Sequence, residues 1–245
     1  MKTVTISGVD EFTSFKRYRD LFYQFPFCEF GILFAPNKEN NRYPSEDWIG
    51  EFVKNVPGKK SLHICPSVIR DGFRDYYKLL GWYADADLID RIQININFKR
   101  NTEYIGEVSR FIDNLQDQYK PVILQFNSAN KDYLHPFTSK ENLQILVDFS
   151  GGNGKTLEVG NLTEFESFLK KVEFPIELGL SGGIDSTNAL KTVANSLRVD
   201  EIGQKRVKWI DAESSLRDNN DEFCISKAIE YLESVEKWAL YGEYE

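Results

Sequence analysis

Apolar residues recur along the chain in short runs of strand length, and the runs return at a regular interval. Their starts lie roughly thirty residues apart, which is the length of one strand–loop–helix–loop unit. An amphipathic stretch typical of a helix follows each run. The eight runs are Val4–Ser7, Phe30–Ala35, Ser61–Cys65, Arg91–Asn97, Pro121–Asn127, Leu143–Phe149, Ile176–Leu180 and Val207–Ala212. Eight such units in 245 residues predict one α/β domain over residues 1–245, a closed (β/α)8 TIM barrel, because that fold takes about 250 residues.

Several of the amphipathic stretches carry helix-start signals. Ser45 precedes two acidic residues and an apolar run, and Asp185 precedes a similar run. Thr163 and Glu166 have the spacing of a capping box, which predicts that Thr163 caps a helix. The fifth connection is the exception, because residues 130–134 allow barely one turn before a proline.

Composition narrows the function classes. The net charge of −8, with acidic and basic residues interspersed, argues against nucleic-acid binding. No apolar run reaches about 18 residues and no signal peptide is evident, so we expect a cytoplasmic protein without a membrane partner. Three widely spaced cysteines and two histidines predict no metal site, and no cofactor is expected. The chain is expected to be a monomer or a homodimer.

Amide side chains gather where two of the predicted strands end. Gln93 and Asn95 follow one another at a spacing of two, as do Gln125 and Asn127, so each pair faces one side of its strand. Ligands of such barrels bind at the carboxyl ends of the strands. Two interpretations remain open: a buried plug of amides that satisfy one another, or a polar pocket in which Asn95 and Asn127 bind a hydroxyl-rich ligand.

Two segments near the end of the chain predict phosphate binding. Gly182 and Gly183 follow the seventh predicted strand and precede a helix, so backbone N–H groups can approach an anion there. Ser214 and Ser215 follow the eighth strand, the other half of the phosphate site common in these barrels. A second glycine-rich loop, residues 151–155, is either a flap that carries Lys155 to the ligand or a plain surface turn.

The motifs together resemble the phosphoribosylanthranilate isomerase family, within the ribulose-phosphate-binding barrels, along most of the chain. Residues 31–36 with Arg42-Tyr43 and Ser45 are similar to its GF-x-F-x-P…S-x-RY-x-S segment, which implies that Arg42 contacts the substrate. Leu146-Val147-Asp148 and the glycines at 151–154 resemble its LLD…GGTG, which implies that Asp148 is the general acid. Residues 180–183 resemble its LAGGL, and residues 210–215 resemble its VDVSSGVE.

The chain departs from this family at the position of the catalytic base. The family opens with KICG, whose cysteine removes a proton in an Amadori rearrangement, and this chain has Thr5-Ile6-Ser7-Gly8 instead. A serine hydroxyl needs a neighbouring base to act, and the sequence places no histidine beside Ser7. The sequence therefore does not predict the orthodox isomerase reaction.

Two functions stay open. In the first, the chain is a divergent isomerase of a phosphorylated sugar or sugar-amine, with Asp148 as acid, Glu213 or Asp211 as base and Ser7 as a further catalytic candidate. In the second, it binds a phosphosugar or nucleotide without catalysis. Substitution at position 7 distinguishes the two: if Ser7→Ala leaves turnover of a sugar phosphate unchanged, Ser7 has no catalytic role. An aldolase that forms a Schiff base is disfavoured because no predicted strand ends in an interior lysine.

Overall fold

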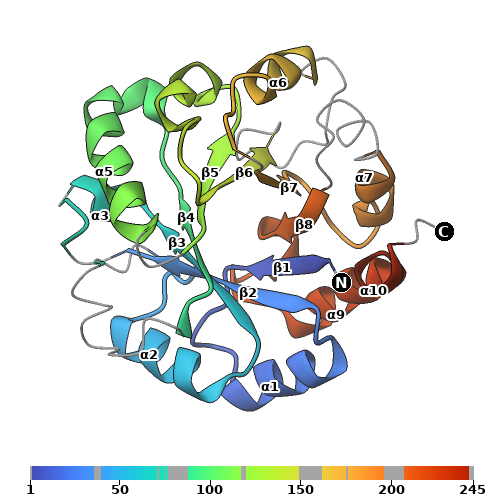
Figure 1. Cartoon of the computed structure of the whole chain (residues 1–245). Coiled ribbons are helices and arrows are strands. Elements are labelled where there is room, and N and C mark those ends of the chain that lie inside the picture. Colours follow the sequence, from blue (N-terminus) through green and yellow to red (C-terminus); the bar gives the residue numbers. More distant parts are fainter. Residues whose placement is uncertain are drawn as a thin grey trace.

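The computed structural model describes residues 2–35, 40–70, 72–74, 76, 88–116, 120–148, 162–174, 176–195 and 207–242. Eight parallel strands pair each with the next along the chain, and the last pairs with the first, so that the sheet closes into a barrel surrounded by helices (Figure 1). The strands are β1 (Thr3–Ser7), β2 (Cys28–Phe34), β3 (Lys59–Ile64), β4 (Arg91–Ile94), β5 (Val122–Phe126), β6 (Leu143–Asp148), β7 (Glu177–Ser181) and β8 (Val207–Ala212). The predicted (β/α)8 TIM barrel is confirmed, with all eight strands in the predicted order.

The described helices lie outside the strands, as the alternation of strand and helix requires (Figure 1). They are α1 (Phe15–Gln24), α2 (Glu46–Asn55), α3 (Pro66–Arg70), α5 (Ile105–Gln116), α6 (Leu162–Leu169), α7 (Ala189–Asn195), α9 (Ile225–Ser234) and α10 (Glu236–Tyr241). The fifth connection has two short 3₁₀ turns, Lys131–Tyr133 and His135–Phe137, as its weak helical pattern predicted. None of the helices in the described ranges is both long and apolar enough to span a membrane.

The helix-start signals are confirmed in part. Ser45 caps α2 by accepting a hydrogen bond from the backbone N–H of Trp48. Asp185 accepts two from the backbone N–H groups of Thr187 and Asn188, just before α7. The prediction that Thr163 is an N-cap is wrong, because α6 already begins at Leu162. A Thr followed by Glu at a spacing of three is also common inside a helix, so the motif alone misplaced the helix start.

Alternation divides each strand into an outer apolar face and an inner polar face. The outer residues, such as Ile6, Ile32 and Ile94, join one large core with the helices. Inside the barrel, Ile123, Leu146 and Trp209 form a separate small apolar cluster. Gly179 makes room for the indole of Trp209, because a Cβ at that position would lie 2.0 Å from a ring atom. Most other inward positions are polar, so the barrel interior is a column of polar side chains interrupted by this one apolar layer.

The base of the column is a buried ionic layer. Arg91 donates from Nε to both carboxylate oxygens of Glu29, at 2.8 and 3.1 Å, and its guanidinium stacks 4.3 Å from the Trp209 ring. Its Nη1 donates to Gln144, whose amide donates in turn to Glu177. Glu29 and Arg91 are 1% and 7% exposed. A buried pair of this kind is stable only when its remaining hydrogen bonds are satisfied, and this network satisfies them.

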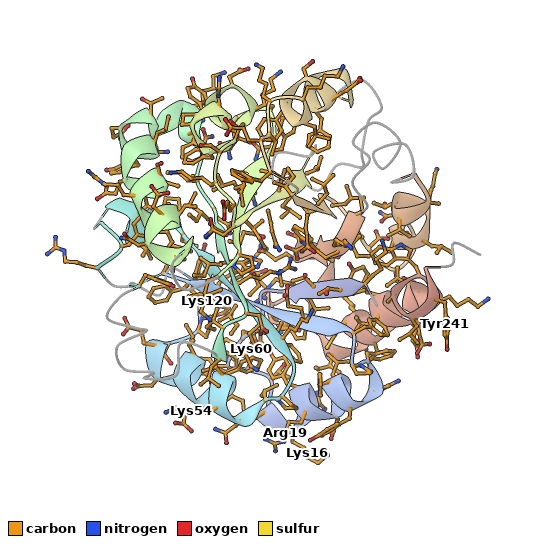
Figure 2. All side chains as sticks on the ribbon, viewed as in Figure 1. Lys16, Arg19, Lys54, Lys60, Lys120 and Tyr241 are labelled. Atoms are coloured by element: carbon orange, nitrogen blue, oxygen red, sulfur yellow. The ribbon has the colours of Figure 1, made fainter. Side chains whose placement is uncertain are left out.

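Polar side chains also lie at the periphery, where they face solvent. Lys16 forms an exposed ion pair with Asp20 on α1, and Tyr241 at the end of α10 projects outward with 72% of its surface exposed (Figure 2). The preceding part of α10 packs inward instead. Trp238 is fully buried, and the Lys2 backbone N–H donates to Ala239 O at 2.8 Å. This last helix therefore packs against the start of β1.

Candidate functional site

A cavity opens at the carboxyl ends of the strands, where barrels of this type bind ligands. Its volume is about 180 Å³, below the roughly 300–1,000 Å³ of sites for drug-sized ligands, so it suits a small molecule. Polar groups make up most of the lining. The lining residues are Arg42, Gln93, Asn95, Gln125, Leu146, Asp148, Ser181, Gly182, Gly183, Ile184, Asp211, Ala212, Glu213, Ser214 and Ser215.

One wall of the cavity is the glycine turn after β7. Gly182 and Gly183 have φ values of +98° and +60°, a left-handed conformation that residues with a Cβ adopt only under strain. Asn188 holds the turn by donating from Nδ2 to Gly183 O at 2.7 Å and accepting from Asp185 N at 3.0 Å. The turn is thus fixed by its own side chains. Helix α7 starts only at Ala189, so the anion-binding potential rests on the backbone of the turn and not on a helix end.

The adjoining wall is the serine turn after β8. Ser214 and Ser215 are the first two residues of a 3₁₀ turn that ends at Leu216, and N–H groups at such positions have no acceptor inside the helix. Ser215 Oγ donates to Ile184 O at 2.6 Å, which ties the serine turn to the glycine turn. The structure therefore brings together all four residues that the sequence predicted for phosphate.

Next to the glycine and serine turns, one residue of β1 and one of β8 form a hydrogen-bonded pair. Ser7 Oγ donates to Asp211 Oδ1 at 2.6 Å. Ser7 fits between its neighbours because Gly31 on β2 has no side chain, and a Cβ there would lie 2.3 Å from Ser7 Oγ. Asp211 lines the cavity, whereas Ser7 is fully buried and does not. Ser7 is therefore connected to the cavity through its hydrogen bond to Asp211, and its role as a catalytic group stays a prediction.

The environment of Asp211 favours its protonated form. Burial, together with the negative charges of Glu213 and Glu29, raises the pKa of this carboxyl to about 8, while the Ser7 hydrogen bond and Arg91 act in the opposite direction. Desolvation disfavours the charged state of any acid. A carboxyl whose pKa lies close to neutral can exchange a proton with a ligand at physiological pH, which is the property required of a general acid or base.

The amide residues form a chain of hydrogen bonds within the cavity lining. Gln93 Nε2 donates to Asn95 Oδ1 at 2.9 Å, and Gln125 Nε2 donates to the same oxygen at 3.2 Å. All three line the cavity. The same amides therefore bond to one another, as in the plug interpretation, and face the cavity, as in the pocket interpretation. Asn127 is different, because its Oδ1 accepts from Ala129 N at 3.0 Å and the residue lies outside the lining. In this position Asn127 stabilises the turn that follows β5.

His63 is part of the packed interior. Its Nδ1 lies 3.3 Å from Gln93 Nε2, and burial lowers the pKa of the ring to about 3, so the imidazole is neutral at physiological pH. His63 is therefore a core histidine that contacts a neighbouring amide.

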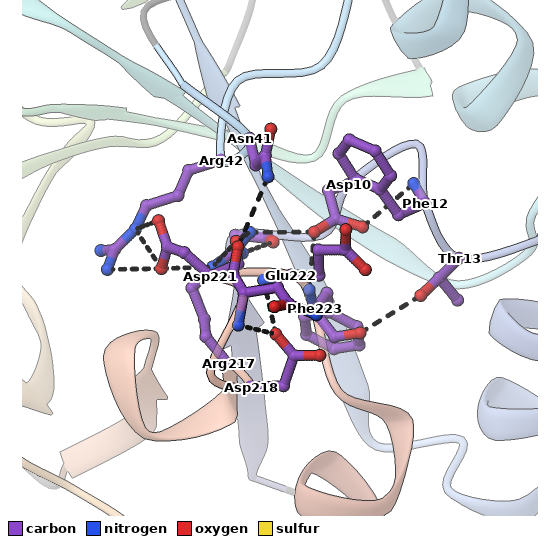
Figure 3. A network of polar contacts seen from close by, with 12 residues as sticks. Asp10, Phe12, Thr13, Asn41, Arg42, Arg217, Asp218, Asp221, Glu222 and Phe223 are labelled. Carbon is purple, nitrogen blue, oxygen red and sulfur yellow. Dashed lines mark hydrogen bonds and ion pairs between the residues drawn. The ribbon is translucent and has the colours of Figure 1, made fainter.

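Arg42, in the loop after β2, also lines the cavity. Its Nη1 binds Glu213 Oε1 at 2.9 Å, and its Nε donates to both oxygens of Asp221, at 2.9 and 3.0 Å (Figure 3 shows the bonds to Asp221). The Arg42 guanidinium holds the pKa of Asp221 below its ordinary value. Arg42 thus lines the cavity, as predicted for a ligand contact, but with its charge already matched by two carboxylates.

A second arginine connects the same loop to the start of the chain. Arg217 donates from Nη2 to Asp10 Oδ2 at 2.9 Å and from Nε to Asp221 Oδ1 at 3.1 Å (Figure 3). Asp10 Oδ2 also accepts from Phe223 N at 2.6 Å, and burial raises the pKa of this carboxyl. Both members of the Arg217–Asp10 pair are at least 97% buried. The loops after β1, β2 and β8 are therefore held together by one ionic network.

Sequence reasoning missed this network. Asp10 and Asp221 lie in loops whose polar composition is ordinary, so no local pattern distinguishes them from other surface residues. Lys155 and its glycine-rich loop lie outside the described residues. In the described ranges no three His, Cys, Asp or Glu side chains are grouped so as to hold a metal ion.

Comparison with solved structures finds phosphoribosylanthranilate isomerases among the barrels of similar fold. Monomers generated from the dimeric phosphoribosylanthranilate isomerase of Thermotoga maritima superpose with a TM-score of 0.60 at 13% identity, over 96% of this chain and 99% of that one. TrpF from Jonesia denitrificans gives 0.60 at 12% identity, over 98% and 99%. The phosphoribosyl anthranilate isomerase of Thermus thermophilus gives 0.57 at 14%, over 96% and 98%.

By sequence the chain stands apart, since neither a protein-family model nor a curated protein matches it. At identities of 12–14% the structural likeness shows the shared fold. What the cavity does has to be argued from its own residues.

Proposed function

We propose that the cavity binds a phosphorylated sugar or sugar-amine and catalyses its isomerisation by proton transfer. The observation that carries the proposal is that the glycine turn after β7 and the serine turn after β8 face one cavity and are hydrogen-bonded to each other. Backbone N–H groups from two turns converging on one point form a site for a dianion such as a phosphate. The likeness to isomerase barrels adds support by analogy.

The carboxyl groups supply the chemistry in this proposal. Asp148 protonates the ring oxygen of the bound sugar, which opens the ring. Asp211 in its ionised form, whose share grows as the pH approaches its pKa of about 8, removes the proton from the carbon next to the reacting carbonyl or iminium carbon. The carboxyl so formed returns the proton to the enol or enolamine to give the isomer. Two carboxyl groups on β6 and β8 line the same cavity, which meets the need for an acid and a base. Ser7 orients Asp211, and Arg42 and Lys155 steer the charged ligand.

Phosphate binding is tested by thermal shift with ribose 5-phosphate, inorganic phosphate and unphosphorylated ribose. A ligand of the native state raises the apparent stability, so the two phosphates are expected to raise the melting temperature and ribose is not. Gly183→Val, which puts a β-branched side chain at a φ of +60°, is expected to abolish the shift. Glu230→Gln, at an exposed position of α9, is the matched control and should behave like the parent chain.

Catalysis is tested by proton exchange. With ribose 5-phosphate in D₂O, a functional base replaces the C2 proton by deuterium, which NMR detects even when isomer does not accumulate. Asp211→Asn is expected to abolish exchange, and Ser7→Ala to slow it while leaving phosphate binding intact. Phosphate binding without exchange would support the second function instead, a phosphosugar- or nucleotide-binding protein. The pairing of Arg42 with Glu213 and Asp221 favours that alternative, because among the described lining residues it leaves no unpaired cation for the substrate.

A further inference from the structure

The amide side chains of β4, β5 and the turn after β5 are hydrogen-bonded in one fixed direction. Asn127 Oδ1 accepts from the backbone N–H of Ala129 at 3.0 Å. A backbone N–H can only donate, so the oxygen of the Asn127 amide, and not its nitrogen, faces that group. The nitrogen Nδ2 is then left to donate to Gln125 Oε1, at 3.5 Å. One backbone group therefore sets the orientation of the first two amides.

The same direction continues to the third and fourth amides. Because its oxygen faces Asn127, Gln125 offers Nε2 to Asn95, whose Oδ1 accepts at 3.2 Å. Gln93 Nε2 donates to the same oxygen at 2.9 Å and lies 3.3 Å from His63 Nδ1. His63 is neutral, because burial lowers its pKa to about 3, so this Nδ1 can accept. Both neighbours thus donate to Asn95 Oδ1, which uses its two acceptor positions.

Two amide atoms are left without a hydrogen-bond partner in the described residues, Asn95 Nδ2, a donor, and Gln93 Oε1, an acceptor. Both residues line the cavity, and Gln93 is 3% exposed, so the space that its oxygen reaches is the cavity. Neither atom is sealed from solvent, in contrast to Ser61 Oγ and His63 Nε2, which are buried. The cavity lining therefore presents one N–H donor and one C=O acceptor from two amides in contact.

A hydroxyl group fits this pair of atoms. Its oxygen can accept from Asn95 Nδ2 while its proton is donated to Gln93 Oε1. A carboxylate only accepts and would oppose the Gln93 oxygen, and an ammonium only donates and would oppose the Asn95 N–H groups. In the closed order of eight strands, β4, which carries both amides, lies opposite β8, which leads into the serine turn. The hydroxyl would therefore belong to the part of a sugar that is distant from its phosphate.

We propose that Asn95 and Gln93 together bind one hydroxyl group of the phosphosugar, at a carbon distant from the phosphate. This inference rests on the proposed phosphosugar site and specifies its substrate class, a sugar phosphate with free hydroxyl groups as opposed to a deoxysugar phosphate. Asn95 and Gln93 act here as specificity-determining residues.

Calorimetric titration with ribose 5-phosphate, its 2-deoxy and 3-deoxy analogues and inorganic phosphate tests the proposal. Ribose 5-phosphate is expected to bind about tenfold more tightly, or better, than at least one analogue, because the missing hydroxyl leaves both amide atoms unpaired. Asn95→Leu, of similar volume without a donor, is expected to reduce this ratio below about threefold and to leave inorganic phosphate binding unchanged. Asn55→Leu, at the exposed end of α2, is the matched control and should keep the full ratio.

Affinity for ribose 5-phosphate no greater than for both analogues, or than for inorganic phosphate, would overturn the inference and leave the phosphate site standing. Retention of the full ratio in Asn95→Leu would overturn the role of Asn95. If the leucine variant no longer binds inorganic phosphate, Asn95→Ala takes its place with the same expected result. Failure of the parent chain to bind any of the four compounds would overturn the proposed function and this inference with it.

Discussion

Substitution of Asp211 by asparagine tests whether this carboxyl holds a proton near neutral pH. In the unfolded chain the group has its ordinary pKa of 3.8, and in the fold burial raises the pKa to about 8. Between these values the folded protein keeps a proton that the unfolded chain has lost. The stability that this proton confers is fully present below about pH 4 and is lost as the pH rises to about 8.

The expected magnitude follows from the interval. Each pH unit corresponds to about 1.4 kcal/mol, so the loss over about four units is about 5–6 kcal/mol. The asparagine amide does not ionise in this range, and its carbonyl still accepts the Ser7 hydrogen bond. The free energy of unfolding of Asp211→Asn should therefore be close to that of the parent at pH 4. By pH 8 the variant should exceed the parent by several kcal/mol.

Urea unfolding at pH 4, 5, 6, 7 and 8 measures this difference directly. Glu230→Gln, which removes one exposed carboxyl from α9, corrects for the general effect of losing a negative charge. Parallel curves for Asp211→Asn and the parent between pH 5 and 8 would show that Asp211 is ionised throughout. The assignment of this residue as a proton carrier at neutral pH would then fail.

Two further predictions concern the barrel interior. Arg91→Met leaves the buried Glu29 carboxylate without its cation and should lower the free energy of unfolding in urea by about 3–5 kcal/mol, most of which adding Glu29→Gln should restore. A decrease below about 1 kcal/mol would mean that Arg91 and Glu29 do not form an ion pair in solution. Gly179→Ala places a Cβ 2.0 Å from the Trp209 ring and should lower the free energy of unfolding by about 1–3 kcal/mol or more. Gly106→Ala, with nothing within 4 Å of its Cβ, is the control and should leave stability unchanged or raise it, so equal effects of the two substitutions would refute the close packing of Trp209.

The fold could be predicted from sequence because its strands repeat one local pattern. The predicted carboxyl ends of the strands were less accurate where polar residues continue the alternation beyond the last hydrogen bond between strands. The fourth run was predicted to extend to Asn97, yet β4 ends at Ile94, and Asn97 instead caps the next turn by accepting from Arg100 N. In the same way β5 ends at Phe126, one residue before Asn127, and Asn127 bonds to the turn that follows.

The site was predictable as far as local motifs extend. The glycine and serine turns are each visible in a few consecutive residues, and the barrel topology makes them neighbours. The pairing of Ser7 with Asp211 joins residues 204 apart, and that of Arg42 with Asp221 joins residues 179 apart. Such contacts depend on barrel closure and on loop conformations that no local pattern encodes. They decide the electrostatics of the cavity.

Charges at one end of the polar column act on titratable groups at the other end. Glu29, in the ionic layer at the base, raises the pKa of Asp211 at the mouth, and Arg91 opposes it. In barrels of this type the amino-terminal face is usually assigned to stability and the carboxyl-terminal face to function. In this chain a substitution in the ionic layer at the base can change the pKa of Asp211 without contacting a ligand. Adaptation of the cavity to a new proton-transfer reaction therefore need not begin among the residues that line it.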